Sequence, residues 1–405
     1  MNSSVSELQT NEKIPLAVYL LAICQALMMS VTSLLITASA LVCLTLVENK
    51  ALVTVPLSLQ FLAMMLSTAP ASLLMGKYGR KRGFMFGSLF AIVGGLILVY
   101  AVFNDSFLLF SLGSFLIGVF NGFASFFRFA AVELVNETNK PKAISYVLVG
   151  GVIAAFIGPN LANFGRSMFV DEVFAGGFVY ATLLSMGIFF VLSVIKFPPV
   201  TVKNTKDSGR PLPEIIKQPT FIVAVICGML GYGVMTYVMT ATPLAMNHHQ
   251  HEFSDTAFVI QWHVLAMFAP SFFTGSIIQR IGVINVLIIG ASLALLCMLI
   301  NLNGYTMTHF WLALFALGVS WNFLFIGAST LLTETYRKEE TAKSQAFNDF
   351  SVFSMVTLAS LSSGYFQNSF GWEVINYSGL AFVAVIALSL AWLLMMPTEK
   401  RLANR

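Results

Sequence analysis

Charged residues divide this chain into long uncharged stretches. A membrane-spanning helix needs about 20 apolar residues, because the hydrocarbon core is about 30 Å thick. Cutting the chain at every Asp, Glu, Lys and Arg leaves eleven stretches of that length or more: 14–47, 51–76, 83–104, 106–127, 143–165, 173–195, 218–251, 256–279, 281–333, 350–372 and 374–398. The stretch 281–333 is too long for one helix and contains the turn-like cluster Asn301–Gly304, so it counts as two. The pattern therefore predicts an all-α integral membrane protein with twelve transmembrane helices.

The composition agrees with this prediction. Hydrophobic residues make up 57% of the 405 residues and charged residues 10%, and the mean hydropathy is +0.82. Soluble domains carry about 25% charged residues, and disordered chains are polar and rich in charge, so both classes are excluded. The four cysteines (Cys24, Cys43, Cys227 and Cys297) lie in hydrophobic stretches without metal-ligand spacing, and we expect neither a disulfide framework nor a metal site from them.

Lysines and arginines are distributed unevenly between the two sides of the predicted membrane. With a cytoplasmic N-terminus, 19 of the 22 fall on the cytoplasmic side, Lys50 and Arg166 fall on the other side, and Arg128 lies within a helix. Because positive charges concentrate in cytoplasmic loops, this split predicts that both termini are cytoplasmic and that His248–His251 lies outside. The net charge of +4 then needs no nucleic-acid partner to explain it.

One polar stretch divides the chain into two halves. Residues 196–217 contain four prolines and five basic residues, and they fall between the sixth and seventh predicted helices. We therefore expect an N-terminal six-helix bundle over 1–195, a cytoplasmic linker over 196–217 and a C-terminal six-helix bundle over 218–405.

The two halves also repeat each other. The repeated residues end the second and eighth helices or lie in the fourth and tenth, at spacings of 200 to 203 residues. The matched pairs are Lys77 and Arg280, Gly79 and Gly282, Gly118 and Gly318, and Glu133 and Glu334. Six-helix halves that repeat each other are typical of one class of secondary transporter.

The repeated loop resembles the loop motif of the major facilitator superfamily. That motif runs Gly-x-x-x-Asp-Arg-x-Gly-Arg-Arg between helices two and three, with a weaker copy between helices eight and nine. The matching residues are Lys77, Gly79, Arg80 and Lys81 in the first copy and Gly275, Arg280 and Gly282 in the second. Gly76 and Gln279 replace the Asp, so the resemblance leaves open how the cytoplasmic side is held closed.

The resemblance implies a secondary transporter, not an enzyme. In this family two bundles rock about a central site and expose it to each side in turn, and helices one, four, seven and ten line the cavity. The family also places an Arg of the loop near the end of helix four, so we expect the ion pairs Arg80–Glu133 and Arg280–Glu334. Met239–Met246 and Trp321–Phe323 look like bacterial members, which indicates a bacterial cytoplasmic (inner) membrane.

The fourth predicted helix carries a polar face. Small and polar residues recur along it at steps of three and four, which places them on one side: Ser111, Ser114, Gly118, Asn121, Ser125 and Arg128. Such a face should point at protein or water, because polar groups in hydrocarbon need partners. We favour a cavity lining because Arg128 shares this face, and the alternative is a close-packed helix seam.

Arg128 is the most informative charge, because it lies about 8 Å inside the end of helix four. An arginine within the membrane is costly, so Arg128 either binds an anion or forms a gate, or it snorkels to the cytoplasmic interface. Asp349 lies at a similar depth in helix eleven, and the resemblance brings helices four and eleven together at the cytoplasmic gate. We expect Arg128 and Asp349 to pair when this gate closes; alternatively, Asp349 is a helix N-terminal residue stabilised by the dipole.

Further polar and aromatic residues fall within the predicted helices. His263 lies about 12 Å inside helix eight, where it either carries a proton or stays neutral and bonds a neighbouring helix. The cluster His248–His251 is either a metal site or a solvated loop. Candidate substrate contacts combine aromatic and amide groups, as binding pockets do: Gln25, Trp262, Trp321 and Asn322.

Helix five contains Gly158-Pro159, which resembles the antiporter motif of the family, although Ala162 and Asn163 replace its closing glycine pair. The alternative is a proline kink packed through glycines. We therefore expect a monomer that needs no cofactor and moves a small solute through the bilayer with proton coupling, export being favoured over import. The alternatives are a channel, or a membrane enzyme or scaffold, but no nucleotide loop, metal motif or nucleophile elbow supports an enzyme.

Overall fold

The computed structural model describes residues 14–136, 139–198 and 209–397, and throughout these ranges the regular structure is helical. Its elements run in the order α1 (Leu16–Leu46), η1 (Lys50–Leu52), α2 (Val55–Tyr78), α3 (Arg80–Phe103), α4 (Phe107–Ala124), α5 (Phe127–Val132), α6 (Lys140–Gly165), α7 (Ala175–Val194), α8 (Leu212–Ile216), α9 (Pro219–His248), α10 (Phe253–Phe268), α11 (Ser271–Ile281), α12 (Val283–Leu302), α13 (Met307–Thr333), η3 (Lys338–Glu340), α14 (Thr341–Phe370) and α15 (Trp372–Met395). The predicted all-α membrane fold is confirmed.

Within the described residues, ten helices are long and apolar enough to cross a membrane. The bent pair α10–α11 brings the number to eleven. Helix α14 is more polar, but its 30 residues span about 45 Å at 1.5 Å per residue, and counting it is compatible with the twelve predicted spans. It begins at Thr341 rather than near residue 350, because Lys343 and Asp349 lie inside the helix.

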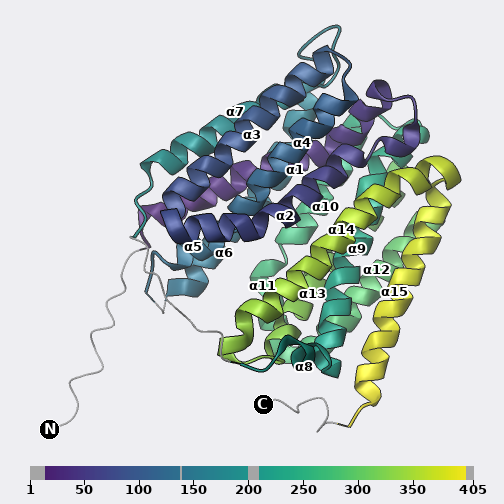
Figure 1. Ribbon diagram of the computed structural model, residues 1–405. Coiled ribbons are helices and arrows are strands. Elements are labelled where there is room, and N and C mark those ends of the chain that lie inside the picture. The colour runs from purple at the N-terminus through teal and green to yellow at the C-terminus, as the bar shows by residue number, and fades with distance from the viewer. Residues whose placement is uncertain (1–13, 137–138, 199–208, 398–405) are drawn as a thin grey trace.

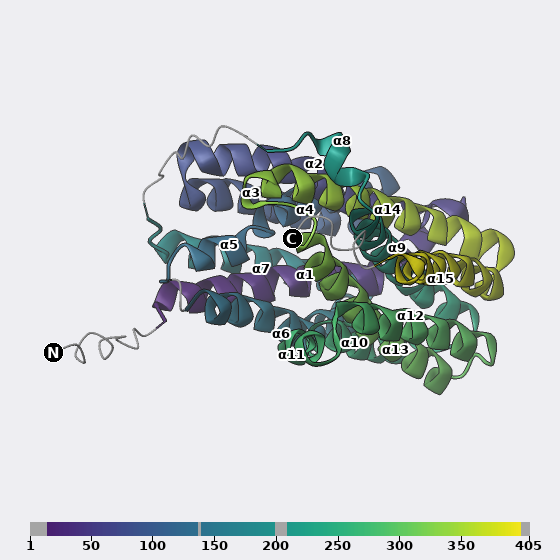
Figure 2. The same cartoon turned by 90° about the horizontal axis from the view of Figure 1, so that it is seen from below.

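The helices form two groups, each packed mainly within itself (Figure 1). Helices α1–α7 make the first group and α9–α15 the second. The groups meet along two lines, α2 against α14 and α6 against α10, which lie on opposite edges of the molecule in Figure 2. In Figure 1 the two groups diverge toward the end that carries α8, which we call the linker end.

The buried apolar clusters show the same divergence. Toward the end opposite the linker, two clusters contain residues of both groups; one includes Phe61 and Val238, and the other includes Leu35 and Leu244. At the linker end, one cluster consists of residues of the first half of the chain around Phe127, and another consists of second-group residues around Phe221 together with Ile215 of α8. Among the described residues, the apolar core is therefore continuous between the groups only away from the linker, and the two groups are open to each other's inner faces toward the linker end.

Two glycines form equivalent turns at the linker end. Gly79 joins α2 to α3 with φ 91° and ψ 157°, and Gly282 joins α11 to α12 with φ 85° and ψ 152°. This region of backbone space is essentially restricted to glycine, because a Cβ atom would be strained there. The 203-residue repeat therefore corresponds to a repeated backbone conformation.

The linker is attached to the second group of helices. Residues 199–208 of the predicted linker lie outside the described residues, but Arg210 binds the buried carboxylate of Glu340 through Nη2 at 2.7 Å and Nε at 2.9 Å. Nη2 also donates to the Thr335 carbonyl oxygen at 3.1 Å. The hydrogen bonds that the Arg210 side chain donates to Glu340 are the main reason why the pKa of Glu340 is lowered to about 2. This carboxylate therefore stays ionised.

Candidate functional site

Five aromatic side chains of the second group form one wall where the two groups meet. They come from α9, α10, α13 and α14, and we call them the aromatic wall: Tyr232, Phe268, Trp321, Phe325 and Phe353. The rings of Trp321 and Phe325 are stacked, with centroids 5.2 Å apart and planes 7° apart. Tyr232 meets Trp321 edge-on at 5.2 Å, and Phe268 meets it at 5.7 Å.

Trp321 carries an unused hydrogen-bond donor within this wall. Its side chain is buried, and Nε1 has no hydrogen-bond partner among the described residues, as is also the case for Trp262, Trp311 and Trp372; Trp321 differs from these three in that it belongs to the wall. Buried indole N–H groups usually have a partner, because an unmade hydrogen bond is costly. The wall therefore offers flat apolar surface together with a donor, which suits a planar ligand with a carbonyl or ring-nitrogen acceptor.

The first group contributes polar side chains from α1 and α4. Asn121 donates from Nδ2 to the hydroxyl of Thr32 at 3.2 Å, which links α4 to α1. Gln25 is half-buried on α1, and the hydroxyl of Ser125 donates to the Gly122 carbonyl oxygen of its own helix at 2.8 Å. Amide and hydroxyl groups therefore occur on the first-group helices, whereas the aromatic rings of the wall belong to the second group.

The polar face predicted on helix four divides into two parts. A Cβ atom on Gly118 would lie 2.1 Å from the backbone oxygen of Gln60, and one on Gly122 would lie 2.0 Å from the hydroxyl of Ser67, so this part packs closely against α2. The helix is then interrupted at Ser125-Phe126, and Arg128 belongs to the short helix α5. A close-packed helix seam therefore explains Gly118 and Gly122. The alternative, a residue that lines a cavity, suits Arg128.

Arg128 has many protein neighbours, but its side chain is still accessible to solvent. The side chain of Asp349 on α14 is accessible too. The Arg128 guanidinium lies over the Phe129 ring, 4.8 Å from its centroid, and the Asn348 side chain donates to Asp349 at 3.1 Å. The two charges interact electrostatically, but these two described residues form no ion pair within 4.0 Å. Asp349 lies eight residues inside α14, so it is not a helix N-terminal residue.

Asn322 has a role that its sequence position did not reveal. Its side chain is fully buried and bonds three groups at the break between α10 and α11. The amide is saturated by these bonds, so in this structure Asn322 does not offer it to a substrate, although its neighbour Trp321 belongs to the aromatic wall.

His263 and Trp262 lie away from this wall. His263 is fully buried, and its Nδ1 lies 2.7 Å from the Leu314 carbonyl oxygen, which fits the alternative of a neutral histidine that donates to a neighbouring helix. Trp262 packs with Phe258, Trp311 and Phe315 in a separate aromatic cluster.

The cluster His248–His251 packs around an aromatic residue. The His249 ring stacks on Tyr305 at 4.1 Å, and Nε2 of His251 lies 2.7 Å from the Tyr305 carbonyl oxygen. Burial and the neighbouring imidazoles lower the pKa of His249. In the part of the chain that the structure describes, no group of three or more His, Cys, Asp or Glu side chains could hold a metal ion.

One of the two expected ion pairs of the loop motif is confirmed. Arg80 binds Glu133 through two hydrogen bonds of 2.7 Å and 3.2 Å, and it also lies over the Phe126 ring. The expectation of a matching pair in the second half is wrong, because Arg280 and Glu334, both described, form no ion pair within 4.0 Å. Arg280 lies on α11, which bends 45° away from α10, so the second copy does not reproduce the geometry of the first.

The remaining motif residues differ in how tightly they pack. Lys77 lies over the Tyr78 ring, 5.2 Å from its centroid, whereas a Cβ atom on Gly275 would meet nothing within 4 Å. Gly158 precedes Pro159 within α6, and its Cβ would lie 2.7 Å from the Ser30 carbonyl oxygen of α1. A close α1–α6 seam therefore accounts for this glycine without reference to the direction of transport.

The contacts that close the end opposite the linker were not predicted. Asn160 of α6 donates to Gln261 of α10 at 2.6 Å, and the hydroxyl of Ser58 on α2 donates to that of Ser360 on α14 at 3.1 Å. Phe174, with φ 77°, packs edge-on against Phe253 at 4.7 Å. These contacts consist of neutral hydrogen bonds and aromatic rings, types that occur throughout the chain and gave no distinctive sequence signal.

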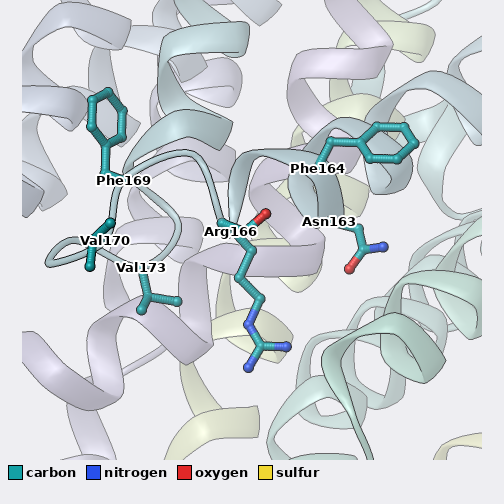
Figure 3. A pocket seen from close by; sticks show the side chains of 7 residues that line it. Asn163, Phe164, Arg166, Phe169, Val170 and Val173 are labelled. Carbon is teal, nitrogen blue, oxygen red and sulfur yellow. The ribbon is translucent and has the colours of Figure 1, made fainter.

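A separate pocket of about 550 Å³ lies beside this closed end, around Arg166. Figure 3 shows the Arg166 side chain projecting from the loop after α6, with Val170 and Val173 on one side and Asn163 on the other. The guanidinium lies 5.8 Å from the rings of both Phe174 and Phe253. None of these lining residues belongs to the aromatic wall, so we place the candidate site at the wall rather than in this pocket.

Comparison with known proteins agrees with this architecture. A profile of the Major Facilitator Superfamily matches residues 18–347 and, in an overlapping match, 225–405. The chain is 40% identical over 375 residues to the riboflavin transporter RfnT of Brucella anthropi, covering 92% of this chain and 94% of RfnT. It is 26% identical over 357 residues to the uncharacterised MFS-type transporter YddS of Bacillus subtilis, covering 82% and 81% of the two chains.

Solved structures of transporters share the fold. A D-xylose-proton symporter superposes with a TM-score of 0.75 at 13% identity, covering 96% of this chain and 99% of its own. A mutant of the nucleoside transporter NupG superposes with a TM-score of 0.73 at 15% identity, covering 94% and 99%. The family resemblance of the loop motif is thereby confirmed, and a transporter rather than an enzyme is indicated. The chain belongs to the Major Facilitator Superfamily.

Proposed function

We propose that this transporter carries riboflavin or a closely related flavin across the cytoplasmic membrane of a bacterium. The observation that carries the proposal is the aromatic wall itself, in which Tyr232, Phe268 and Phe325 surround the Trp321 indole, whose Nε1 has no partner among the described residues. An isoalloxazine is a flat tricyclic ring with carbonyl and ring-nitrogen acceptors on one edge, which is the chemistry that such a wall accommodates. The 40% identity to a riboflavin transporter over nearly the whole chain supports the same substrate class.

The two sides of the site suit the two parts of a flavin. Aromatic contacts contribute about 0.5–1.5 kcal/mol each beyond the area that they bury, so the ring system gains most from the second-group wall. The ribityl chain carries hydroxyl groups, which need hydrogen-bond partners when they leave water. Gln25, Asn121 and Thr32 on the first group supply such partners. A flavin bound in this way would contact both groups of helices.

The expected mechanism is alternating access by a multi-pass monomer. The described core is continuous between the two groups away from the linker and separate at the linker end, as expected for one of two alternating states. If the linker is cytoplasmic, as the charge distribution indicates, this state faces the cytoplasm. Proton coupling would use Asp349, since protonating it would release its attraction to Arg128. The antiporter-like Gly158-Pro159 of helix five favours export over import, and the same Gly158 also packs closely against α1.

Riboflavin binding to the purified protein tests the substrate. Flavin fluorescence is quenched on stacking with tryptophan, so Kd follows directly from a titration. Trp321→Ala should raise Kd at least about tenfold, which is about 1.4 kcal/mol, and Trp321→Phe should lie between this variant and wild type because it keeps the ring and loses the donor.

Trp311→Ala is the matched control, because Trp311 packs with Trp262 away from the wall. This control should keep Kd within about twofold of wild type, a difference of less than 0.5 kcal/mol. Equal losses in Trp311→Ala and Trp321→Ala, or no riboflavin binding by the wild type, would contradict the proposed substrate.

A further inference from the structure

Trp321 and Asn322 are adjacent on α13, and their side chains serve two different places. Trp321 belongs to the aromatic wall, whereas Asn322 reaches the break between α10 and α11. At this break, Ala269 and Pro270 separate two helical segments that meet at 45°. One dipeptide therefore touches both the candidate substrate site and a bend in a spanning helix.

The break interrupts the helical hydrogen-bond pattern at the end of α10, and Asn322 binds a backbone carbonyl there. Pro270 has no N–H to donate to the preceding turn, α10 ends at Phe268, and α11 begins at Ser271 at an angle of 45°. Nδ2 of Asn322 donates to the Met267 oxygen at 2.6 Å. A buried carbonyl needs such a partner, so Asn322 stabilises the bent form specifically.

The same amide holds the first turn of α11. Its Nδ2 lies 2.6 Å from the hydroxyl of Ser271, and its Oδ1 lies 2.6 Å from the hydroxyl of Thr274, which can donate to it. The Thr274 hydroxyl also lies 2.8 Å from the Pro270 oxygen, and its single proton serves one acceptor at a time. Turning the amide over would place two carbonyl oxygens 2.6 Å apart, so the orientation is fixed by its neighbours.

Helix α11 has little else to hold it in place. Of its eleven residues, all of them described, only Thr274 is buried. Helix α10, by contrast, is packed tightly against α13, because a Cβ atom on Gly318 would lie 2.5 Å from the backbone oxygen of His263. Thus α10 is fixed to α13, while the position of α11 depends on the bonds to Asn322.

The bend also positions one residue of the aromatic wall. Phe268 is the last residue of α10, and its ring meets Trp321 at 5.7 Å. On its other side lies Gly151 of α6, in the first group, where a Cβ atom would come within 2.6 Å of the Phe268 ring. Phe268 thus fills the seam between the two groups at the point where α10 ends.

We infer that Asn322 is a positioning residue that fixes the α10–α11 bend and couples substrate contact at Trp321 to the position of α11. A ligand that stacks against Trp321 and Phe268 acts on both sides of the break, and Asn322 transmits the effect to Ser271 and Thr274. The identity of that ligand rests on the proposed function, whereas the role of Asn322 in holding α11 does not.

The test uses an isosteric pair at Thr274 in the full-length protein. Thr274→Val keeps the shape and removes the bond to Asn322, whereas Thr274→Ser keeps the hydroxyl. Spin labels at Gln279→Cys on α11 and Lys142→Cys on α6, in a background without the four buried native cysteines, report the distance across the linker end. The matched control is Thr330→Val, because the Thr330 hydroxyl bonds only the Ile326 oxygen of its own helix.

Without ligand, Thr274→Val should broaden the distance distribution, and Thr274→Ser and Thr330→Val should reproduce that of wild type. With riboflavin, Thr274→Val should keep Kd within about threefold but lose at least about tenfold in turnover, because binding and movement are uncoupled. Wild-type distances and turnover in Thr274→Val, or equal changes in all three variants, would overturn the inference. If riboflavin does not bind wild type, the proposed substrate fails, and the ligand-free distances still decide the role of Asn322.

Discussion

Arg128 and Asp349 approach from opposite groups of helices and interact electrostatically without forming an ion pair within 4.0 Å. Both side chains are exposed although they lie in spanning segments. The molecule is open at the same end, since its core clusters there belong to one group or the other. This geometry fits a pair that forms only when the linker end closes.

The first prediction concerns this pair. Asp349→Ala and Arg128→Ala should each reduce transport at least about tenfold, because closing the linker end would bury an unpaired charge. The exchange Arg128→Asp with Asp349→Arg should restore part of the rate, measured as riboflavin flux in proteoliposomes. Full activity in Asp349→Ala would exclude a gate. Loss in Arg128→Ala alone would instead assign Arg128 to substrate binding.

The second prediction concerns the pH dependence of stability through Glu340. Its pKa falls from the usual 4.5 to about 2, mainly because the Arg210 side chain donates to it. A lowered pKa means that the folded state favours the ionised form, so the stabilisation is complete above about pH 4.5 and is lost as the pH falls toward 2. The upper limit of this stabilisation is a little over 3 kcal/mol, because each unit of pKa difference between the folded and unfolded states corresponds to about 1.36 kcal/mol.

Thermal unfolding of wild type and Glu340→Gln checks this dependence. The variant should unfold at a lower temperature than wild type at pH 7, and the difference should shrink as the pH is lowered below 4.5. Glu48→Gln is the control, because Glu48 is exposed after α1, in the other group of helices. A difference between wild type and Glu340→Gln that stays constant from pH 7 to pH 3 would contradict the assignment.

The third prediction follows from the two turn glycines. Gly79→Ala and Gly282→Ala should each destabilise the protein by about 1–3 kcal/mol, because a Cβ atom is strained at φ 91° and 85°. Gly76→Ala, one turn earlier inside α2, should instead be neutral or stabilising, since nothing lies within 4 Å of its Cβ position and alanine favours a helix. Unfolding temperatures in detergent give the comparison. A Gly79→Ala variant that unfolds at the same temperature as wild type would contradict the prediction and show that the turn accommodates a Cβ atom.

The fourth prediction is the topology. A membrane-impermeant thiol reagent added to intact cells should label His248→Cys, which is exposed at the end of α9, and should leave Lys217→Cys unlabelled until the membrane is permeabilised. The reason is the concentration of lysines and arginines on one side of the spans. Labelling of Lys217→Cys from outside would show that the orientation is the opposite of the predicted one. The state that is open at the linker end would then face outward.

The sequence predicts the fold better than it predicts the helix ends. Charge-free stretches identify spanning helices because charges are costly in lipid, but α14 begins at Thr341 and carries Lys343 and Asp349 inside it. The rule fails there because a helix that borders an open space can carry charges. The interruption at Ser125-Phe126 also has no charge to mark it.

The site was only partly predictable for related reasons. Trp321 stands out because the chain has five tryptophans, whereas Phe268, Phe325 and Phe353 are three of 37 phenylalanines and carry no distinguishing pattern. Asn322 was predicted as a substrate contact, but its side chain binds residues 48 to 55 positions away in the chain, and sequence spacing says nothing about such contacts. The pair Arg80–Glu133 was expected from the loop motif, but the same reasoning failed for Arg280 and Glu334, because α11 bends away from α10.

The central claim is that a flavin is carried past the aromatic wall by alternating access. Counterflow in proteoliposomes tests it most directly: vesicles preloaded with unlabelled riboflavin and diluted into labelled riboflavin should accumulate label transiently, with saturable kinetics. Trp321→Ala should abolish this accumulation, and Trp311→Ala should retain it. Riboflavin flux without saturation or counterflow would indicate a channel. Counterflow that survives in Trp321→Ala, or that occurs with an unrelated solute and not with riboflavin, would contradict the proposed site and substrate.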